Sequence, residues 1–293
     1  MRLVAAAAML LAAAPAGAET LALERADGSA IIYHLDRPRE GRRPMLLLLQ
    51  GSGCDRAGGD AQLAATAPVL APGHAVLRIE KYGVGTEGSA AVEGCPAAYW
   101  SGNTLTQRVL DAVQVIARLR RERWWNRELF VFGGSEGGAV AAMLAPLVPE
   151  TRAVVIRSSG IGVPVAELIR AAVPPPVAAE LPRILAEARA NPSGAIRWGG
   201  ASYRWWADAA ELVPARMLLQ TDAPVLLIHG ARDQFAPVSS ARAARDLFAA
   251  AGARNLTYRE YPLFDHFMTD AGGVSHREAV LREAASWLRR NSR

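Results

Sequence analysis

Short apolar runs, each bounded by glycine, proline or polar residues, recur along the chain. Runs of this kind without alternation are typical of strands buried on both faces of a parallel sheet. They are Met45–Gln50, His74–Ile79, Leu129–Gly133, Ala153–Ile156 and Val225–Ile228. Ala30–Leu35 also has strand composition, and Leu256–Tyr261 is predicted to be the last strand.

Helical periods lie between these runs. One helix is predicted after a capping box of Thr104 and Gln107. Its apolar face consists of Leu105, Val109, Ala112, Val113, Ile116 and Leu119. A second helix spans Ser240–Ala251, and a last one opens at a capping box of Ser275 and Glu278. Alternating strands and helices predict one α/β domain with a mostly parallel sheet flanked by helices.

Residues 162–221 interrupt this alternation. The segment carries helical pieces and the proline-rich stretch Val173–Pro176, with no strong strand. It also holds an aromatic cluster of Trp198, Tyr203, Trp205 and Trp206. We expect a helical cap inserted between two strands of a single domain over residues 19–293. The aromatic cluster either packs the cap or forms a wall that contacts substrate.

The first eighteen residues have the pattern of a secretory signal peptide. Met1-Arg2 is a short positive start, Leu3–Ala13 is apolar but too short to span a bilayer, and Ala16-Gly17-Ala18 is a small-residue cleavage site. We expect cleavage after Ala18 and a periplasmic or secreted protein with no stable membrane insertion. A short membrane anchor is the alternative interpretation.

The composition is that of a folded protein. The chain has 293 residues, of which 51% are hydrophobic and 21% charged, and this excludes a disordered chain. The net charge is +5, but Lys81 is the only lysine and the arginines are interspersed with acids, as in Arg118–Arg123. Mixed charge predicts a solvated surface and no nucleic-acid partner, since a phosphate-binding face needs clustered charge of one sign.

Gly133-x-Ser135-x-Gly137 is the stretch most informative about chemistry. It directly follows a buried run and precedes an alanine-rich helix at Ala139–Ala145. A sharp strand-to-helix turn strains the serine backbone, and side chains at the two glycine positions would clash. Ser135 is therefore predicted to be a nucleophile. The alternative is a glycine-rich packing turn.

A nucleophilic serine needs a base, and the chain order in folds with such a turn is serine, acid, histidine. His266 and His276 are the histidines late enough in the chain. Because His276 follows the cap of the last helix, we predict that His266 is the base. Asp233, which follows the run Val225–Ile228, is predicted to orient His266. The other acids weighed are Asp222, at the wrong end of that strand, and Asp265, adjacent to the histidine.

These segments resemble the α/β-hydrolase superfamily, and more narrowly the dienelactone-hydrolase-like and prolyl-oligopeptidase-like serine hydrolases. The resemblance spans roughly residues 30–290 and rests on Leu48–Ser52, Gly133–Gly137, His229–Asp233 and Asp265-His266. It implies an oxyanion hole of two backbone N–H groups. One would come from Glu136, next to the nucleophile, and the other from the Gln50–Gly53 loop, where we favour Ser52.

One glycine-rich stretch and the two cysteines remain to be interpreted. Gly83–Gly88 matches a dinucleotide-binding pattern, but Gly94 and Pro96 follow where that pattern needs a helix, so we expect no nucleotide. No cofactor or metal is expected either.

Cys54 and Cys95 lie in loops that follow neighbouring strands at the same end of the sheet. In an oxidising compartment they are predicted to form a disulfide; the alternative is two unrelated thiols.

The sequence thus predicts an exported serine hydrolase that cleaves a carboxylic ester of a small-molecule acyl substrate through an acyl-enzyme. A serine peptidase and a thioesterase or acyltransferase are alternatives on the same fold. A non-catalytic binding protein is the alternative from another class.

Overall fold

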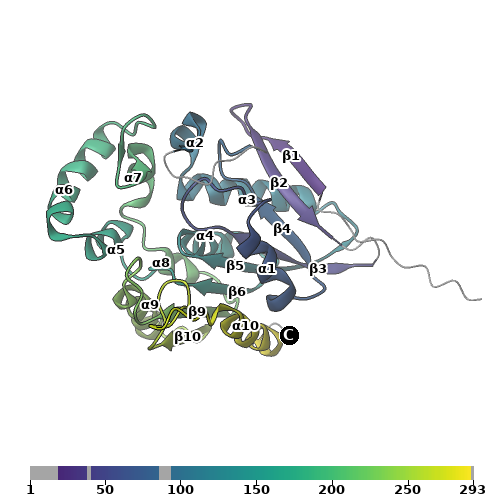
Figure 1. Cartoon of the computed structure of the whole chain (residues 1–293). Helices are drawn as coiled ribbons and strands as arrows, with labels where there is room; N and C mark the ends of the chain where they lie inside the picture. Colours follow the sequence, from purple (N-terminus) through teal and green to yellow (C-terminus); the bar gives the residue numbers. More distant parts are fainter. Residues whose placement is uncertain (1–18, 38–40, 86–93, 292–293) are drawn as a thin grey trace, which may run out of the picture.

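A computed structural model of the chain describes residues 19–37, 41–85 and 94–291 (Figure 1). An eight-stranded sheet lies at its centre, in the order β1-β2-β4-β3-β5-β6-β9-β10. The strands are β1 Glu19–Glu24, β2 Ala30–Asp36, β3 Arg43–Leu49, β4 Ala75–Ile79, β5 Trp125–Gly134, β6 Thr151–Arg157, β9 Val225–Gly230 and β10 Leu256–Tyr261. All pairs from β4 to β10 are parallel, and the β1–β2 and β2–β4 pairs are antiparallel. The prediction of a mostly parallel sheet is confirmed.

Helices cover both faces of the sheet, which is why its strands appear as continuous apolar runs. On one face, Leu46 and Leu48 of β3 belong to a buried cluster with residues of α1 and α10. On the other, Met45, Leu47 and Leu49 join a larger cluster with α3, α4, α8 and α9. The helices are α1 Ala61–Leu70, α3 Leu105–Leu119, α4 Glu136–Leu144, α8 Pro214–Leu218, α9 Val238–Ala250 and α10 Arg277–Asn291.

The predicted elements differ from the observed ones in a few places. β1 was not predicted, because its six residues alternate between exposed and partly buried and carry no apolar run. The hydroxyl of Thr104 accepts the N–H of Gln107 at 3.0 Å, but the Gln107 side chain donates to Asp111 and does not return to the cap. The α9 helix begins at Val238, two residues before the predicted start.

The segment between β6 and β9 is largely helical. It contains α5 Val165–Ala172, α6 Pro175–Ala190, α7 Tyr203–Ala209 and α8, with a short hairpin of β7 Arg197–Trp198 and β8 Ala201–Ser202. In Figure 1, α5, α6 and α7 group at one side of the molecule, away from the β1–β2 hairpin. Ser135, at the start of α4, and this segment line one pocket.

The predicted signal peptide, residues 1–18, lies outside the described residues, as does part of the Gly83–Gly88 stretch. None of the helices in the described ranges is long and apolar enough to cross a bilayer.

Candidate active site

Ser135 occupies the turn between β5 and α4 in a strained conformation, with φ 53° and ψ −128°. The turn is tight on both sides. A Cβ at Gly133 would lie 2.2 Å from the carbonyl oxygen of Gly137, and a Cβ at Gly137 would lie 2.3 Å from that of Leu49. Both positions therefore require glycine. A non-glycine residue held at positive φ is a feature of catalytic turns, where the surrounding structure bears the strain.

His266 and Asp233 come from loops after β10 and β9 and meet at a hydrogen bond. His266 Nδ1 lies 2.8 Å from Asp233 Oδ2, and both residues are buried. The carbonyl of His266 accepts the Ser158 hydroxyl at 2.7 Å and an Arg157 N–H at 3.2 Å. These contacts fix the backbone of His266, and the hydrogen bond to Asp233 engages its ring at Nδ1. Ser135 and His266 line the same pocket.

Asp233 is held from several directions. Its Oδ1 accepts the backbone N–H groups of Phe235 at 2.9 Å and Ala236 at 2.8 Å. His229 Nε2 lies 3.3 Å from Oδ2 and 2.7 Å from the carbonyl of Ala236. Burial would raise the pKa of Asp233, but hydrogen bonds from His229 and His266 and the Ala236 N–H hold it well below its ordinary value. The carboxylate is therefore ionised throughout the neutral range.

The rival residues lie in other contacts. Oδ1 of Asp265 accepts the N–H groups of Phe267 and Thr269, both at 2.8 Å, within its own loop. His276 is half-buried, pairs with Asp270 at 2.8 Å and stacks on Phe264 with ring centroids 4.5 Å apart. The described contacts thus engage Asp265 within its own loop and His276 with Asp270 and Phe264.

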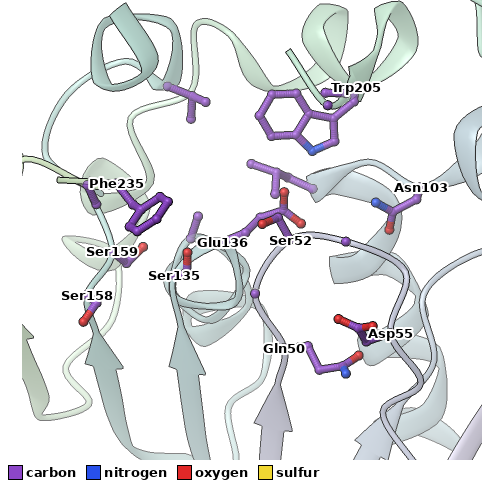
Figure 2. Close-up of a pocket in the computed structure, with 18 of the residues that line it drawn as sticks. Gln50, Ser52, Asp55, Asn103, Ser135, Glu136, Ser158, Ser159, Trp205 and Phe235 are labelled. Carbon is purple, nitrogen blue, oxygen red and sulfur yellow. The ribbon is translucent and has the colours of Figure 1, made fainter. Parts of the chain in front are cut away.

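The Gln50–Gly53 loop, which follows β3, passes directly beside the serine. A Cβ on Gly51 would lie 3.3 Å from Ser135 Cβ and 3.8 Å from its Oγ. Figure 2 shows Ser135 with Ser52 and Glu136 on one side and Phe235 on the other. Glu136 is the first residue of α4, so its N–H has no partner within the helix. The structure thus brings together the two segments from which the oxyanion donors were predicted.

Two buried basic side chains that the sequence analysis did not assign to the site, Arg108 and Lys81, hold this loop. Arg108 of α3 donates to the carbonyl of Gln50 at 2.6 Å and to the carboxylate of Glu136 at 2.7 Å. Lys81 donates to the carbonyl of Gly53 at 2.5 Å. Burial, reinforced by the nearby charge of Arg108, lowers the pKa of Lys81 to about 7. One sequence signal was present: Arg108 falls three residues after Leu105, on the apolar face of its helix.

The pocket above Ser135 has a volume of about 1000 Å³. Phe235 and Phe267 flank the His266 ring, each with a centroid distance of 5.2 Å. Trp205 and Trp206 also line the pocket, while packing edge to face on each other at 5.2 Å. These two tryptophans therefore pack the segment and also line the pocket above Ser135. In the described part of the chain, no group of three or more His, Cys, Asp or Glu side chains is placed to hold a metal ion.

The predicted disulfide between Cys54 and Cys95 is present, with Cα atoms 5.6 Å apart. Its sulfurs lie in a small buried cluster with Val84, Tyr99 and Trp100. The bond ties the end of the Gln50–Gly53 loop to the segment that precedes α2, Ala97–Gly102.

The parallel sheet covered on both faces, with a strained serine turn after β5, defines an α/β-hydrolase. The chain belongs to the serine aminopeptidase S33 family of hydrolases, whose family model matches residues 63–270. The matched range includes Ser135, Asp233 and His266 and leaves out the Gln50–Gly53 loop. No curated protein matches the sequence.

Solved structures with the same fold include esterases and peptidases. Est1E from Butyrivibrio proteoclasticus has 17% identity and a TM-score of 0.61, covering 94% of this chain and 98% of that one. A Pyrococcus furiosus esterase has 14% identity and a TM-score of 0.64, with 94% and 92% covered. A putative dipeptidyl aminopeptidase IV from Bacteroides ovatus has 16% identity and a TM-score of 0.68, but only 36% of that chain is covered. At these identities the likeness shows a shared fold.

Proposed function

We propose that this protein is an exported serine hydrolase that cleaves a carboxylic ester. Ser135 Oγ attacks the acyl carbon while His266 Nε2 takes its proton. His266 then gives the proton to the departing alcohol, which leaves an acyl-enzyme. Water attacks the acyl carbon with His266 again as base, and the acid is released as Ser135 recovers its proton.

The other residues serve these steps through charge and hydrogen bonds. Asp233 holds the His266 tautomer whose Nε2 is unprotonated, and stabilises the imidazolium that forms. The backbone N–H groups of Glu136 and Ser52 bind the oxyanion, and losing one such donor typically costs about 3 kcal/mol.

The observation that carries the proposal is the convergence of Ser135 and an Asp233-bound His266 in one pocket. His266 Nδ1 is 2.8 Å from the carboxylate, and Ser135 is held at φ 53° beside the Gln50–Gly53 loop. The arrangement supports acyl transfer and needs no metal or cofactor for the steps above. Esters are favoured because an alcohol leaves more easily than an amine.

A serine peptidase is the second candidate, because the family takes its name from an aminopeptidase. A thioesterase or acyltransferase would use the same residues. In a non-catalytic binding protein, Ser135 would have no need of a strained turn with a histidine–carboxylate pair in the same pocket.

We also propose that residues 162–221 form a cap on a single domain of residues 19–293, and that residues 1–18 are removed on export. The disulfide supports an oxidising compartment. N-terminal sequencing of the protein from the periplasm or medium should begin at Glu19, and an intact Met1 on a membrane-bound protein would contradict cleavage and favour the membrane anchor.

Fluorophosphonate labelling tests the function in one assay. We expect covalent labelling of the wild-type protein, located at Ser135 by mass spectrometry of the labelled peptide, and none in Ser135→Ala. Turnover of p-nitrophenyl esters should exceed that of aminoacyl anilides and acyl thioesters by orders of magnitude. A preference for anilides would assign a peptidase, and an unlabelled, inactive wild-type protein would contradict the hydrolase.

A further inference from the structure

Arg108 joins two segments that are far apart in the sequence. It lies on α3 with 6% of its side chain exposed, although its helical position belongs to the apolar face. Its guanidinium is forked: one nitrogen donates to Oε1 of Glu136 at 2.7 Å and another to the carbonyl oxygen of Gln50 at 2.6 Å. A planar guanidinium presents such donors at a fixed separation.

The two partners of Arg108 belong to the two segments that carry the proposed oxyanion donors. Glu136 follows the nucleophile and offers its own N–H, whereas Gln50 opens the loop that carries Ser52. Because peptide groups are planar, holding the Gln50 carbonyl sets the orientation of the Gln50–Gly51 peptide and the start of the turn. At the other side of Ser52, the carbonyl of Gly53 is held by Lys81 at 2.5 Å. The loop is thus fixed before and after the donor.

We propose that Arg108 is a positioning residue that fixes the spacing of the two oxyanion donors by tying the Gln50–Gly53 loop to the start of α4. The inference rests on the proposed function. It assigns Arg108 no contact with substrate. Its effect reaches the reaction through the backbone of Gln50 and Glu136, since donors misplaced by a fraction of an ångström stabilise the oxyanion poorly.

A purely structural role makes a different prediction. If Arg108 served only to neutralise the carboxylate of Glu136, which is 13% exposed, its loss would lower stability and leave kcat of the folded protein unchanged. Removing both members of the ion pair would then restore whatever was lost. If Arg108 positions the loop, removing both members leaves the spacing unheld and the defect remains.

The test compares Arg108→Met, Arg108→Lys and the double variant Arg108→Met/Glu136→Leu with the wild-type enzyme. Arg120→Met is the control, because Arg120 at the C-terminal end of α3 also makes a two-pronged pair, with Glu150, at 2.8 Å for both contacts, and neither residue is among those that line the pocket. Folding is checked by circular dichroism. The readouts are kcat and KM for a p-nitrophenyl ester, and the inhibition constant of a phenylboronate that forms a tetrahedral adduct on serine.

We expect Arg108→Met to lower kcat up to about 10²-fold with little change in KM, and to weaken boronate inhibition in parallel. Arg108→Lys, which keeps the charge but lacks the planar fork of two donor nitrogens, should lose less. The double variant, which leaves no unpaired carboxylate, should fold and stay impaired, whereas Arg120→Met should keep wild-type kcat.

Wild-type kcat in either Arg108→Met or the double variant would overturn the positioning role while leaving the hydrolase intact. So would a loss confined to KM. Failure of the proposed function is a separate result: the wild-type protein would neither turn over esters nor react with a fluorophosphonate.

Discussion

Asp233 accepts hydrogen bonds from two histidines and two backbone N–H groups, and each histidine has a different task. His266 faces the pocket, whereas His229 is fully buried and bridges Asp233 and the Ala236 carbonyl. His229 was excluded as the base by chain order. Its position behind the carboxylate gives it a supporting role in orienting Asp233.

Asp233→Asn tests this carboxylate. The amide would donate to His266 Nδ1 and stabilise the wrong tautomer, so kcat should fall about 10⁴-fold with the fold retained. Asp265→Asn is the matched control. Its Oδ1 can still accept the Phe267 and Thr269 N–H groups, and activity should remain near wild type. Initial rates of ester hydrolysis measure both. The opposite ranking of the two variants would assign the acid to Asp265.

Lys81 makes stability depend on pH. Its pKa is lowered from 10.5 to about 7 by burial and by the charge of Arg108, whereas the unfolded chain keeps the proton up to about pH 10.5. Between these values the unfolded state binds more protons, so Lys81 makes the free energy of unfolding rise with pH. Below pH 7 the buried charge imposes its full cost. A methionine at position 81 has no titrating group, so it would add no pH dependence to the free energy of unfolding.

The stability gained by Lys81→Met relative to wild type should therefore be largest near pH 6 and shrink towards pH 10, by at most ~1.4 kcal/mol per pH unit. Urea unfolding at pH 6, 8 and 10 measures the difference. Arg120→Met is a control with no slope, since arginine stays charged throughout. A constant difference for Lys81→Met would show that Lys81 does not titrate in this range.

Residues whose place in the candidate site is marked by a local sequence pattern could be predicted, whereas residues that join it through tertiary contacts could not. Ser135 lies in a local glycine pattern, and His266 and Asp233 follow strands in the expected order. Arg108 and Lys81 act through backbone carbonyls of a loop that is distant in the sequence. The one local signal, the charge of Arg108 on an apolar helical face, does not identify its partners.

At the scale of elements, the strand–turn–helix of β5, Ser135 and α4 is the rigid feature of the site. Its first helical residues press against the end of β3, which leads into the Gln50–Gly53 loop. Glycine at 137 allows this approach, and the same approach places Gly51 within van der Waals reach of Ser135. Packing of these two elements therefore creates the site.

Gly137→Ala should displace the end of β3, because its Cβ would lie 2.3 Å from one backbone carbonyl oxygen and 2.5 Å from the next, those of Leu49 and Gln50. We expect a loss of about 3 kcal/mol in stability or failure to fold, and no turnover. Gly134→Ala is the control. Its Cβ would meet only the guanidinium of Arg157, at 3.3 Å and with no backbone atom in the way, so stability should change by less than ~1 kcal/mol. Equal stability of the two variants in thermal unfolding would contradict the packing argument.

The same contrast between local and tertiary signals holds for elements. The buried strands are apolar runs in any context, so they were predicted from the sequence. β1 alternates weakly because it is an edge strand, and its pairing with β2 depends on the rest of the sheet. The helices of residues 162–221 follow from their composition, but the pocket that they share with Ser135 depends on long-range packing.

At the scale of the whole molecule, the pocket is assembled from segments that follow the carboxyl ends of β3, β5, β6, β9 and β10. This is where ligands bind in sheets of this kind. The sheet and its two helical layers are stabilised by large apolar clusters, whereas the Gln50–Cys54 segment is fixed by two buried basic side chains and one disulfide. Stability of the body and order of this loop can therefore be separated by experiment.

The Cys54–Cys95 bond is expected to affect both the stability of the fold and the order of the Gln50–Gly53 loop. It spans 41 residues and lies one residue past Gly53. The chain-entropy estimate for such a loop is about 4 kcal/mol, and a domain of this size should lose roughly 10 °C in melting temperature on reduction. Because Cys54 also ends the loop that carries Ser52, kcat should fall in the protein that remains folded. Arg108 and Lys81 still hold Gln50 and Gly53, so the loss of kcat should be partial.

Melting temperature and kcat, measured with and without dithiothreitol, test both effects. The double variant Cys54→Ser/Cys95→Ser should match the reduced wild-type protein and be insensitive to the reductant, which separates the bond from other actions of the thiol. Titration of the unfolded, unreduced wild-type protein should find no free thiol, and two thiols would refute the pairing. A lower melting temperature with unchanged kcat below the transition would mean that Arg108 and Lys81 alone order the loop and that the disulfide stabilises only the fold.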